Sequence, residues 1–299
     1  MDSGGKQANS NMLASILRPV QIKTFLDEYF GKKPLLVRGA PGKFDSLMKP
    51  RDFIYRLDRV PEIRCVFDQL RQATIGPADI REMFEAGATI CVTGIDCAHR
   101  SLRIAGRKIR KEIGYAGRVD FRAYLSPPGS GFDFHYDARV ATTLQFEGTK
   151  TWWYSEEPDL PLPIENSSRA DMTAIRLAVS KIKLRRVTLR PGDLLCLPPG
   201  VWHKARAGTG GSFALNMAFN HVGATVLDVI LEELRASLSS EPGCREPFFT
   251  GPPEDLMKPV HGHVHECIDA LQRVLPGLRG TLALRKLEQS AMRRHAVAS

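Results

Sequence analysis

The sequence has no apolar run of the roughly 18 residues that a membrane helix needs. Its first twenty residues also lack a charged segment followed by an apolar core and a small-residue cleavage site. The six cysteines are scattered and form no Cys-x-x-Cys pair, which argues against a zinc ribbon or a disulfide scaffold. We therefore expect neither a membrane span nor a secretory signal, and we expect reduced thiols in a cytoplasmic protein.

Internal repeats and low-complexity tracts are also missing, so the chain of 299 residues, 43% apolar and 25% charged, is typical of a globular protein. Lysine and arginine outnumber aspartate and glutamate by 42 to 33, an excess that favours anionic partners. Six basic residues lie between Arg100 and Lys111, and Arg103, Arg107 and Arg110 would share one face of a helix there. Two interpretations stay open for this face: a solvated helix surface, or a rim for an acidic peptide or nucleic acid.

The first 118 residues predict a flexible N-terminal tail over residues 1–15 and a mixed α/β region over 16–118 that packs on the core. The expected helices cover 20–30, 50–59 and 77–87, and the expected strands cover 35–39 and 89–94.

From residue 119 to residue 221, short β-branched and aromatic runs alternate with Gly/Pro turns. Roughly eight strands in about 100 residues indicate a sandwich or barrel-like β core, so the fold class is mainly β with flanking helices. Residues 222–299 form a C-terminal helical region, with helices expected at 224–238, 265–275 and 282–295. Val226, Ile230 and Leu234 lie along one face of the first of these helices, which favours a homodimer through this region.

The chemistry-bearing motif is His135-Tyr136-Asp137 with a later His203. On a strand, residues i and i+2 point to the same face, so His135 and Asp137 project into one cavity. His203 follows a Pro-Pro-Gly turn, at the start of a strand that can face the first one. Two imidazoles and one carboxylate are the facial triad of non-haem Fe(II) oxygenases, in which three metal positions stay open.

The motif His-x-Asp is weak by itself, and the competing interpretation makes His135 a core histidine and Asp137 a turn residue. The context favours a metal site, because the pair lies among short strands and its partner histidine follows a Pro-Gly-Asp turn, a strand and a second turn.

Three stretches carry a resemblance to a known family. They read F-D-F-H-Y-D-A-R-V-A-T-T-L-Q-F-E-G-T-K-T-W-W-Y-S, L-R-P-G-D-L-L-C-L-P-P-G-V-W-H-K and, upstream, F-L-D-E-Y-F-G-K-K-P-L-L-V-R-G. Together they resemble the JmjC-type, cupin-like 2-oxoglutarate oxygenases, the group of the asparaginyl hydroxylase of hypoxia-inducible factor and the ribosomal-protein hydroxylases.

This resemblance implies a double-stranded β-helix that holds Fe(II) through His135, Asp137 and His203, with 2-oxoglutarate and O2 as co-substrates. It also implies that Lys150 holds the distal carboxylate of 2-oxoglutarate. Strand parity supports this independently, because Lys150, Trp152 and Tyr154 share one face. Burying a charged lysine inside a barrel costs roughly several kcal/mol of folding free energy unless an anion pairs with it. The alternative interpretation makes Lys150 a solvent-exposed lysine on an edge strand.

Further co-substrate contacts implied by the resemblance are Tyr124, Thr143 and Asn216, with Asn220 an open alternative to Asn216. We expect the three tryptophans, Trp152, Trp153 and Trp202, to be core residues. A second metal cluster at His261, His263 and His265 competes with the interpretation of these residues as a polar approach to a helix.

The favoured function is hydroxylation of an unactivated C–H on a protein or peptide side chain. The first alternative is a hydroxylase of a small molecule, such as a free or carrier-bound amino acid or a natural-product intermediate. The second alternative is a cupin that is an isomerase or a binding protein. Nucleic acid is not the expected substrate, and lysine demethylation of histones is disfavoured because no zinc-binding Cys/His module accompanies the core. The segment 156–183 is expected to cover the active site.

Overall fold

The computed structural model describes residues 11–67, 71–167, 172–220, 225–245, 265–277 and 280. The chain divides into two compact units, Met1–His221 and Val222–Ser299. All of the described strands lie in the first unit. Among the described residues, no helix combines the length and the apolar character needed to cross a membrane.

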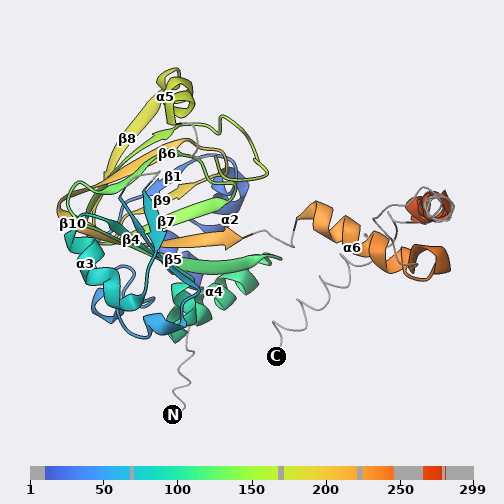
Figure 1. Cartoon of the computed structure of the whole chain (residues 1–299), viewed down its shortest axis with the longest axis horizontal. Helices are drawn as coiled ribbons and strands as arrows, with labels where there is room; N and C mark the ends of the chain where they lie inside the picture. Colours follow the sequence, from blue (N-terminus) through green and yellow to red (C-terminus); the bar gives the residue numbers. More distant parts are fainter. Residues whose placement is uncertain are drawn as a thin grey trace, which may run out of the picture. The chain divides into compact units, whose positions relative to one another are not determined.

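Ten antiparallel strands build the first unit (Figure 1). They are β1 (Leu35–Val37), β2 (Glu62–Val66), β3 (Gln72–Thr74), β4 (Thr89–Thr93), β5 (Arg118–Ser126), β6 (Gly131–His135), β7 (Val140–Ser155), β8 (Leu184–Leu189), β9 (Leu194–Leu197) and β10 (His203–Asn220). The main path runs β1-β9-β7-β10-β5-β4-β2-β3, while β6 pairs with β10 and β8 pairs with β7.

The long strands β7 and β10 each take part in two sheets. The first part of β7 pairs with β9 and with the second part of β10, whereas its second part pairs with β8 and with the first part of β10. The register between them shifts from Ala207 to Ser212, where both strands turn from one sheet to the other. The result is a larger sheet, β1-β9-β7-β10-β5-β4-β2-β3, and a smaller one, β8-β7-β10-β6, which confirms the predicted double-stranded β-helix.

Strand parity separates the packed face of the larger sheet from its cavity face. On β5, Phe121 and Ala123 are fully buried in the main apolar core, while Arg122 and Tyr124 line a cavity. On β10, Leu215 and Met217 belong to the same core, whereas Ala214 and Asn216 line the cavity. The alternation of apolar and polar residues in the sequence therefore gives the same sheet one apolar face and one polar face.

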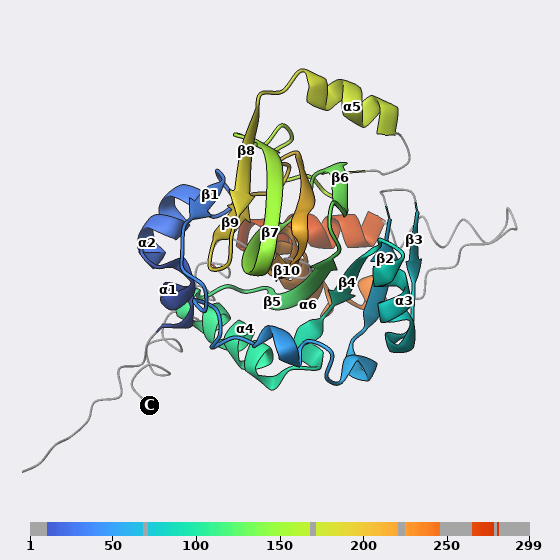
Figure 2. The same ribbon diagram turned by 90° about the vertical axis from the view of Figure 1, so that its left-hand side faces the viewer.

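Helices cover the packed face (Figure 2). The helices of this unit are α1 (Met12–Leu17), α2 (Ile22–Thr24), a π-helical turn (Phe25–Tyr29), α3 (Ile80–Glu85), α4 (Arg100–Ile113) and α5 (Met172–Ser180), with 3₁₀ turns at Pro50–Asp52, Leu57–Arg59, Pro77–Asp79 and Ile95–Cys97. The helix α4 buries Leu102, Ala105 and Ile109, and its Gly106 lies so close to the Val119 carbonyl that a Cβ would approach the oxygen to 2.5 Å. The basic side chains of α4 point outward, as the prediction of a cationic face requires.

Three sequence expectations differ from the structure. The flexible tail assigned to residues 1–15 is wrong from Met12 onward, because α1 buries Leu13 and Glu112 accepts hydrogen bonds from the Met12 and Leu13 amides. The helix at 50–59 is replaced by two 3₁₀ turns, separated at Arg56 by a left-handed backbone conformation (φ 59°). The strands β2 and β3 were not expected at all.

The second unit contains α6 (Val226–Leu238), a 3₁₀ turn (Pro242–Arg245) and a helix over 265–277. Thr225 caps α6 through a reciprocal pair of hydrogen bonds with Asp228. Val226, Leu227 and Leu231 are exposed. The expected helix at 282–295 lies outside the described residues.

Candidate active site

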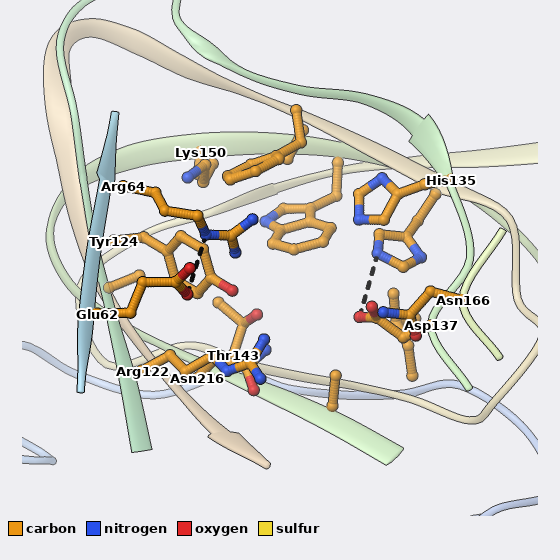
Figure 3. A pocket seen from close by; sticks show the side chains of 17 residues that line it. Glu62, Arg64, Arg122, Tyr124, His135, Asp137, Thr143, Lys150, Asn166 and Asn216 are labelled. Atoms are coloured by element: carbon orange, nitrogen blue, oxygen red, sulfur yellow. Dashed lines mark ion pairs between the residues drawn. The ribbon is translucent and has the colours of Figure 1, made fainter. Parts of the chain in front are cut away.

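A cavity of about 310 Å³ lies between the two sheets of the first unit. Figure 3 shows His135 and Asp137 on one side of it and Lys150, Tyr124, Arg64 and Glu62 on the other. The lining residues are Glu62, Arg64, Arg122, Tyr124, Phe132, His135, Asp137, Ala141, Thr143, Lys150, Trp152, Asn166, Leu197, His203, Ala205, Ala214 and Asn216. The cavity is therefore built from β2, β5, β6, β7, β9 and β10, and from the segment that follows β7.

The three residues predicted to hold a metal converge in this cavity. One ligand atom from each of His135, Asp137 and His203 lies within 4.8 Å of the others, and no other such group occurs among the described residues. His135 and His203 are opposite each other in the register of β6 and β10, with ring centroids 4.2 Å apart. Asp137 lies two residues beyond the end of β6, so it reaches the cavity from a loop and not, as expected, from the strand itself.

Each of the two histidine rings is oriented by a backbone carbonyl. His135 Nδ1 lies 2.7 Å from the carbonyl oxygen of Asp133, and His203 Nδ1 lies 2.8 Å from that of Val201. A carbonyl only accepts, so Nδ1 is the donor in each of these two contacts. This outer hydrogen bond is the usual device for orienting a metal-binding imidazole.

Asp137 is ionised in this arrangement. Burial disfavours its charged form, but the electrostatic interactions with His135 and His203, and then with Arg139 and Arg122, outweigh burial and lower the pKa of the carboxyl. Its Oδ2 lies 3.9 Å from His203 Nε2. The loop that carries Asp137 is fixed on both sides, since its carbonyl accepts from the Gly200 amide and the next amide, of Ala138, donates to Asn166 Oδ1.

Lys150 is buried on the opposite side of the cavity, with 3% of its surface exposed. Its Nζ donates to Ser126 Oγ at 3.0 Å and lies 5.7 Å from the centroid of the Tyr124 ring. No carboxylate within ion-pair distance neutralises it among the described residues, and burial lowers the pKa of Lys150 to about 8.

The other predicted co-substrate residues also line the cavity. Tyr124, Thr143 and Asn216 come from β5, β7 and β10, and Asn216 is paired in register with Thr143. Burial raises the pKa of Tyr124, so its hydroxyl is a donor at neutral pH. Asn216 rather than Asn220 faces the cavity, and its Oδ1 has no partner among the described residues.

These residues fit an Fe(II) ion and 2-oxoglutarate. Two imidazole nitrogens and one carboxylate oxygen are a donor set that Fe(II) accepts with positions left open. A buried ammonium without a counter-ion, together with a buried Trp152 indole N–H that has no acceptor in the described residues, fits an anion of the size of a dicarboxylate.

Several cavity residues were missed by the sequence interpretation. Trp152, expected in the core, lines the cavity with its ring 5.8 Å from that of His203. Glu62 and Arg64 lie on the unexpected strand β2, and Arg122 stands two residues before Tyr124 on β5. Strand parity from Tyr124 would have placed Arg122 in the cavity, because i and i+2 share a face.

Of the second metal cluster, His261 and His263 lie outside the described residues, whereas His265 begins the helix at 265–277.

The comparisons with known proteins agree with this geometry. A family model described as JmjC domain matches residues 103–226. The chain is similar to an uncharacterized protein, YxbC, of Bacillus subtilis (27% identity, covering 79% of this chain and 78% of the relative). It is also similar to ribosomal oxygenase 2 of Bos taurus (29%, covering 66% and 44%) and to the bifunctional lysine-specific demethylase and histidyl-hydroxylase NO66 of Aedes aegypti (27%, covering 64% and 32%). The chain thus spans less than half the length of these last two relatives.

Solved structures share the fold. The Escherichia coli protein YcfD superposes with a TM-score of 0.57 at 18% identity, covering 85% of this chain and 68% of that one. A structure of the same ribosomal oxygenase in complex with cobalt and 2-oxoglutarate gives a TM-score of 0.54 at 18% identity, covering 84% and 67%.

The fold and the site define the class of protein: a cupin-like double-stranded β-helix with a His/Asp/His centre. Within that class, residues 103–226 match the JmjC domain model, which agrees with the predicted resemblance to the JmjC-type proteins.

Proposed function

We propose that this chain is an Fe(II)- and 2-oxoglutarate-dependent oxygenase that hydroxylates an unactivated C–H on a protein or peptide side chain. The observation that carries the proposal is the placement of His135, Asp137 and His203 on one side of a polar cavity and of the buried, unneutralised Lys150 on the other. The names of the ribosomal oxygenase and histidyl-hydroxylase relatives support protein as the substrate class.

The division of labour follows from the residues. Fe(II) and 2-oxoglutarate, when bound, supply the oxidising power for C–H hydroxylation by O2, with succinate and CO2 as the other products. His135, Asp137 and His203 hold the metal on one side and leave its cavity side open. Lys150 Nζ binds the distal carboxylate, with the Tyr124 hydroxyl as a second donor. Trp152 and the apolar Leu197 and Ala205 exclude water around the reacting carbon.

The test is anaerobic addition of Fe(II) and 2-oxoglutarate to the apoprotein, followed by optical absorption for the metal-to-ligand charge-transfer band and by a succinate assay after O2 is admitted. We expect the band and succinate from the wild type. His135→Ala loses metal binding, and Lys150→Ala keeps the metal but weakens 2-oxoglutarate affinity about 100-fold, because a buried charge pair is lost.

The matched control is Lys181→Ala, a change of an exposed lysine, which leaves both unchanged. Metal binding without the band or succinate in the wild type would overturn the oxygenase proposal and favour a cupin of another activity. Incubation with a cell extract and mass spectrometry for a gain of one oxygen separates a protein substrate from a small molecule.

We also propose a homodimer that covers the exposed apolar residues of α6, and a cytoplasmic location. Val226, Leu227 and Leu231 are each more than half exposed, which supports a partner surface. All six cysteines are free thiols, three of them buried, which suits a reducing compartment. Light scattering should give a dimer mass for the wild type and a monomer mass for Leu231→Glu, and a monomeric wild type would contradict the dimer.

Cell fractionation tests the proposed cytoplasmic location.

A further inference from the structure

A row of polar side chains crosses five neighbouring strands beside the metal centre. In register, Glu62 of β2 is opposite Thr93 of β4, Thr93 is opposite Arg122 of β5, Arg122 is opposite Asn216 of β10, and Asn216 is opposite Thr143 of β7. Four of the five line the cavity, and Thr93 is joined to the row because its Oγ1 donates to Glu62 Oε2. The buried atoms of such a row need polar partners, because buried polar groups are costly when unpaired.

At the β2 end of the row, Glu62 pairs with Arg64, the neighbouring residue on the same face of β2. Arg64 Nε lies 3.3 Å from Glu62 Oε2, and Arg64 also donates to Gln72 Oε1 at 3.1 Å. Glu62 in turn accepts from Thr93. The carboxylate of Glu62 is therefore neutralised within β2 and β4, upstream of the segment that matches the JmjC domain.

The centre of the row is not satisfied. The guanidinium of Arg122 makes no hydrogen bond or ion pair with any residue that the structure describes, and its Nε is buried. The two carboxylates that interact electrostatically with Arg122 are those of Asp137 and Asp120, and each has another partner. Asp120 is 4.0 Å from Arg118, and Asp137 belongs to the metal centre.

The charge of the cavity also indicates that Arg122 lacks a partner. Its lining carries three cationic side chains, Arg64, Arg122 and Lys150, and two carboxylates, Glu62 and Asp137. A divalent metal and the dianion 2-oxoglutarate cancel each other, so one positive charge remains after both have bound. A buried cation in excess is stabilised by an anionic group of a third component. The net charge of +9 of the whole chain and the exposed basic face of α4 attract the same kind of partner.

We infer that Arg122 is a substrate-binding residue that pairs with a carboxylate, and that the substrate is therefore an acidic peptide segment with Asp or Glu close to the hydroxylated residue. Arg64, held by Glu62, forms the neighbouring wall and adds to the positive potential (Figure 3). This inference rests on the proposed function, since it names the substrate class of the same site.

The experiment measures binding and not turnover. The full-length protein is loaded with Mn(II) and a non-decarboxylating oxalyl analogue of 2-oxoglutarate, and is applied to a positional array of capped decapeptides. We expect enrichment of Asp and Glu at one or two adjacent positions. Synthetic peptides that differ only by Asp or Asn at that position should then differ about tenfold in affinity.

Charge reversal gives the sharpest variants. Arg122→Gln removes the tenfold preference, and Arg122→Glu turns it toward Lys or Arg at the same position. The matched control, Arg185→Gln on the exposed face of β8, keeps the wild-type preference. Circular dichroism confirms that each variant is folded, and titration with 2-oxoglutarate in the presence of Mn(II) confirms an unchanged co-substrate affinity.

Each result decides the matter. An uncharged or basic preference in the wild type, or an acidic preference that survives Arg122→Glu, overturns the inference. A loss of 2-oxoglutarate affinity in Arg122→Gln also overturns it, because Arg122 would then bind the co-substrate. If the acidic preference depends on Arg122 but the iron-loaded protein forms no succinate, the inference stands and the proposed hydroxylation falls.

Discussion

Lys150 is the residue at which local chemistry and function are most tightly joined. Its ammonium has one neutral partner, Ser126 Oγ, and 3% exposure, so the protein bears the cost of a buried charge until an anion binds. In the proposed function, the same residue costs stability in the apoprotein and binds the co-substrate, a common compromise at active sites.

The pH dependence of unfolding should show this cost. The pKa of Lys150 is lowered from 10.5 to about 8 by burial. Between these two pH values, the unfolded chain binds a proton that the folded protein does not. The free energy of unfolding of the apoprotein therefore increases as the pH rises from about 8 to 10.5, by about 3 kcal/mol in total. We expect Lys150→Met to be more stable than the wild type below pH 8, with the difference shrinking toward pH 10.

Urea unfolding of both proteins at pH 7, 8, 9 and 10 measures this difference. Taking the difference removes the contributions of Cys196 and Tyr124, whose pKa values are raised by burial in both proteins. The exposed Lys181→Met is the control. Parallel pH profiles for wild type and Lys150→Met would show that Lys150 is not held as a charge at a cost.

At the scale of elements, the bend that β7 and β10 share brings the two halves of the site together. Beyond it, β7 carries Lys150 and Trp152, and before it Thr143, while β10 carries His203 and Asn216 on its two sides. Gly148 is at the bend with φ +64°, and a Cβ there would lie 2.1 Å from the carbonyl oxygen of Gly211. Only glycine permits this approach of the two backbones.

Gly148→Ala should therefore cost about 3 kcal/mol of unfolding free energy, from backbone strain and from the displaced partner strand. Gly129→Ala is the matched control, because Gly129 has φ +74° but nothing within 4 Å of the added Cβ, and it should cost only about 1 kcal/mol. Urea unfolding measures both. Equal losses would mean that the close contact with Gly211 is not what holds the bend.

At the scale of the whole molecule, every residue that lines the cavity belongs to the first of the two compact units. The apolar cluster behind the larger sheet joins α1, the π-helical turn and α4 to β5 and β10, so the upstream region is part of the same core as the JmjC domain. The catalytic core of 119–221 is therefore not the smallest folding part.

A fragment of residues 1–221 should fold and keep the wild-type affinity for 2-oxoglutarate within about twofold, since no cavity residue is removed. The charge-transfer band formed under anaerobic conditions with Fe(II) measures this affinity. A fragment of residues 119–221 is the comparison, and we expect it to be unfolded by circular dichroism because Phe121 and Met217 lose the partners that bury them. A folded short fragment, or a 1–221 fragment without the band, would contradict this division.

The sequence by itself determined what depends on near neighbours along the chain. Alternation on β7 put Lys150 and Trp152 on one face, and the turn before His203 predicted the start of a strand there, because both depend on a few adjacent residues. The resemblance to a family was needed to assign that face to the cavity. The tertiary structure alone decided which distant strands lie side by side. Glu62 and Thr143 belong to one polar row only through the register of five strands, and register is set by long-range packing that no local pattern encodes.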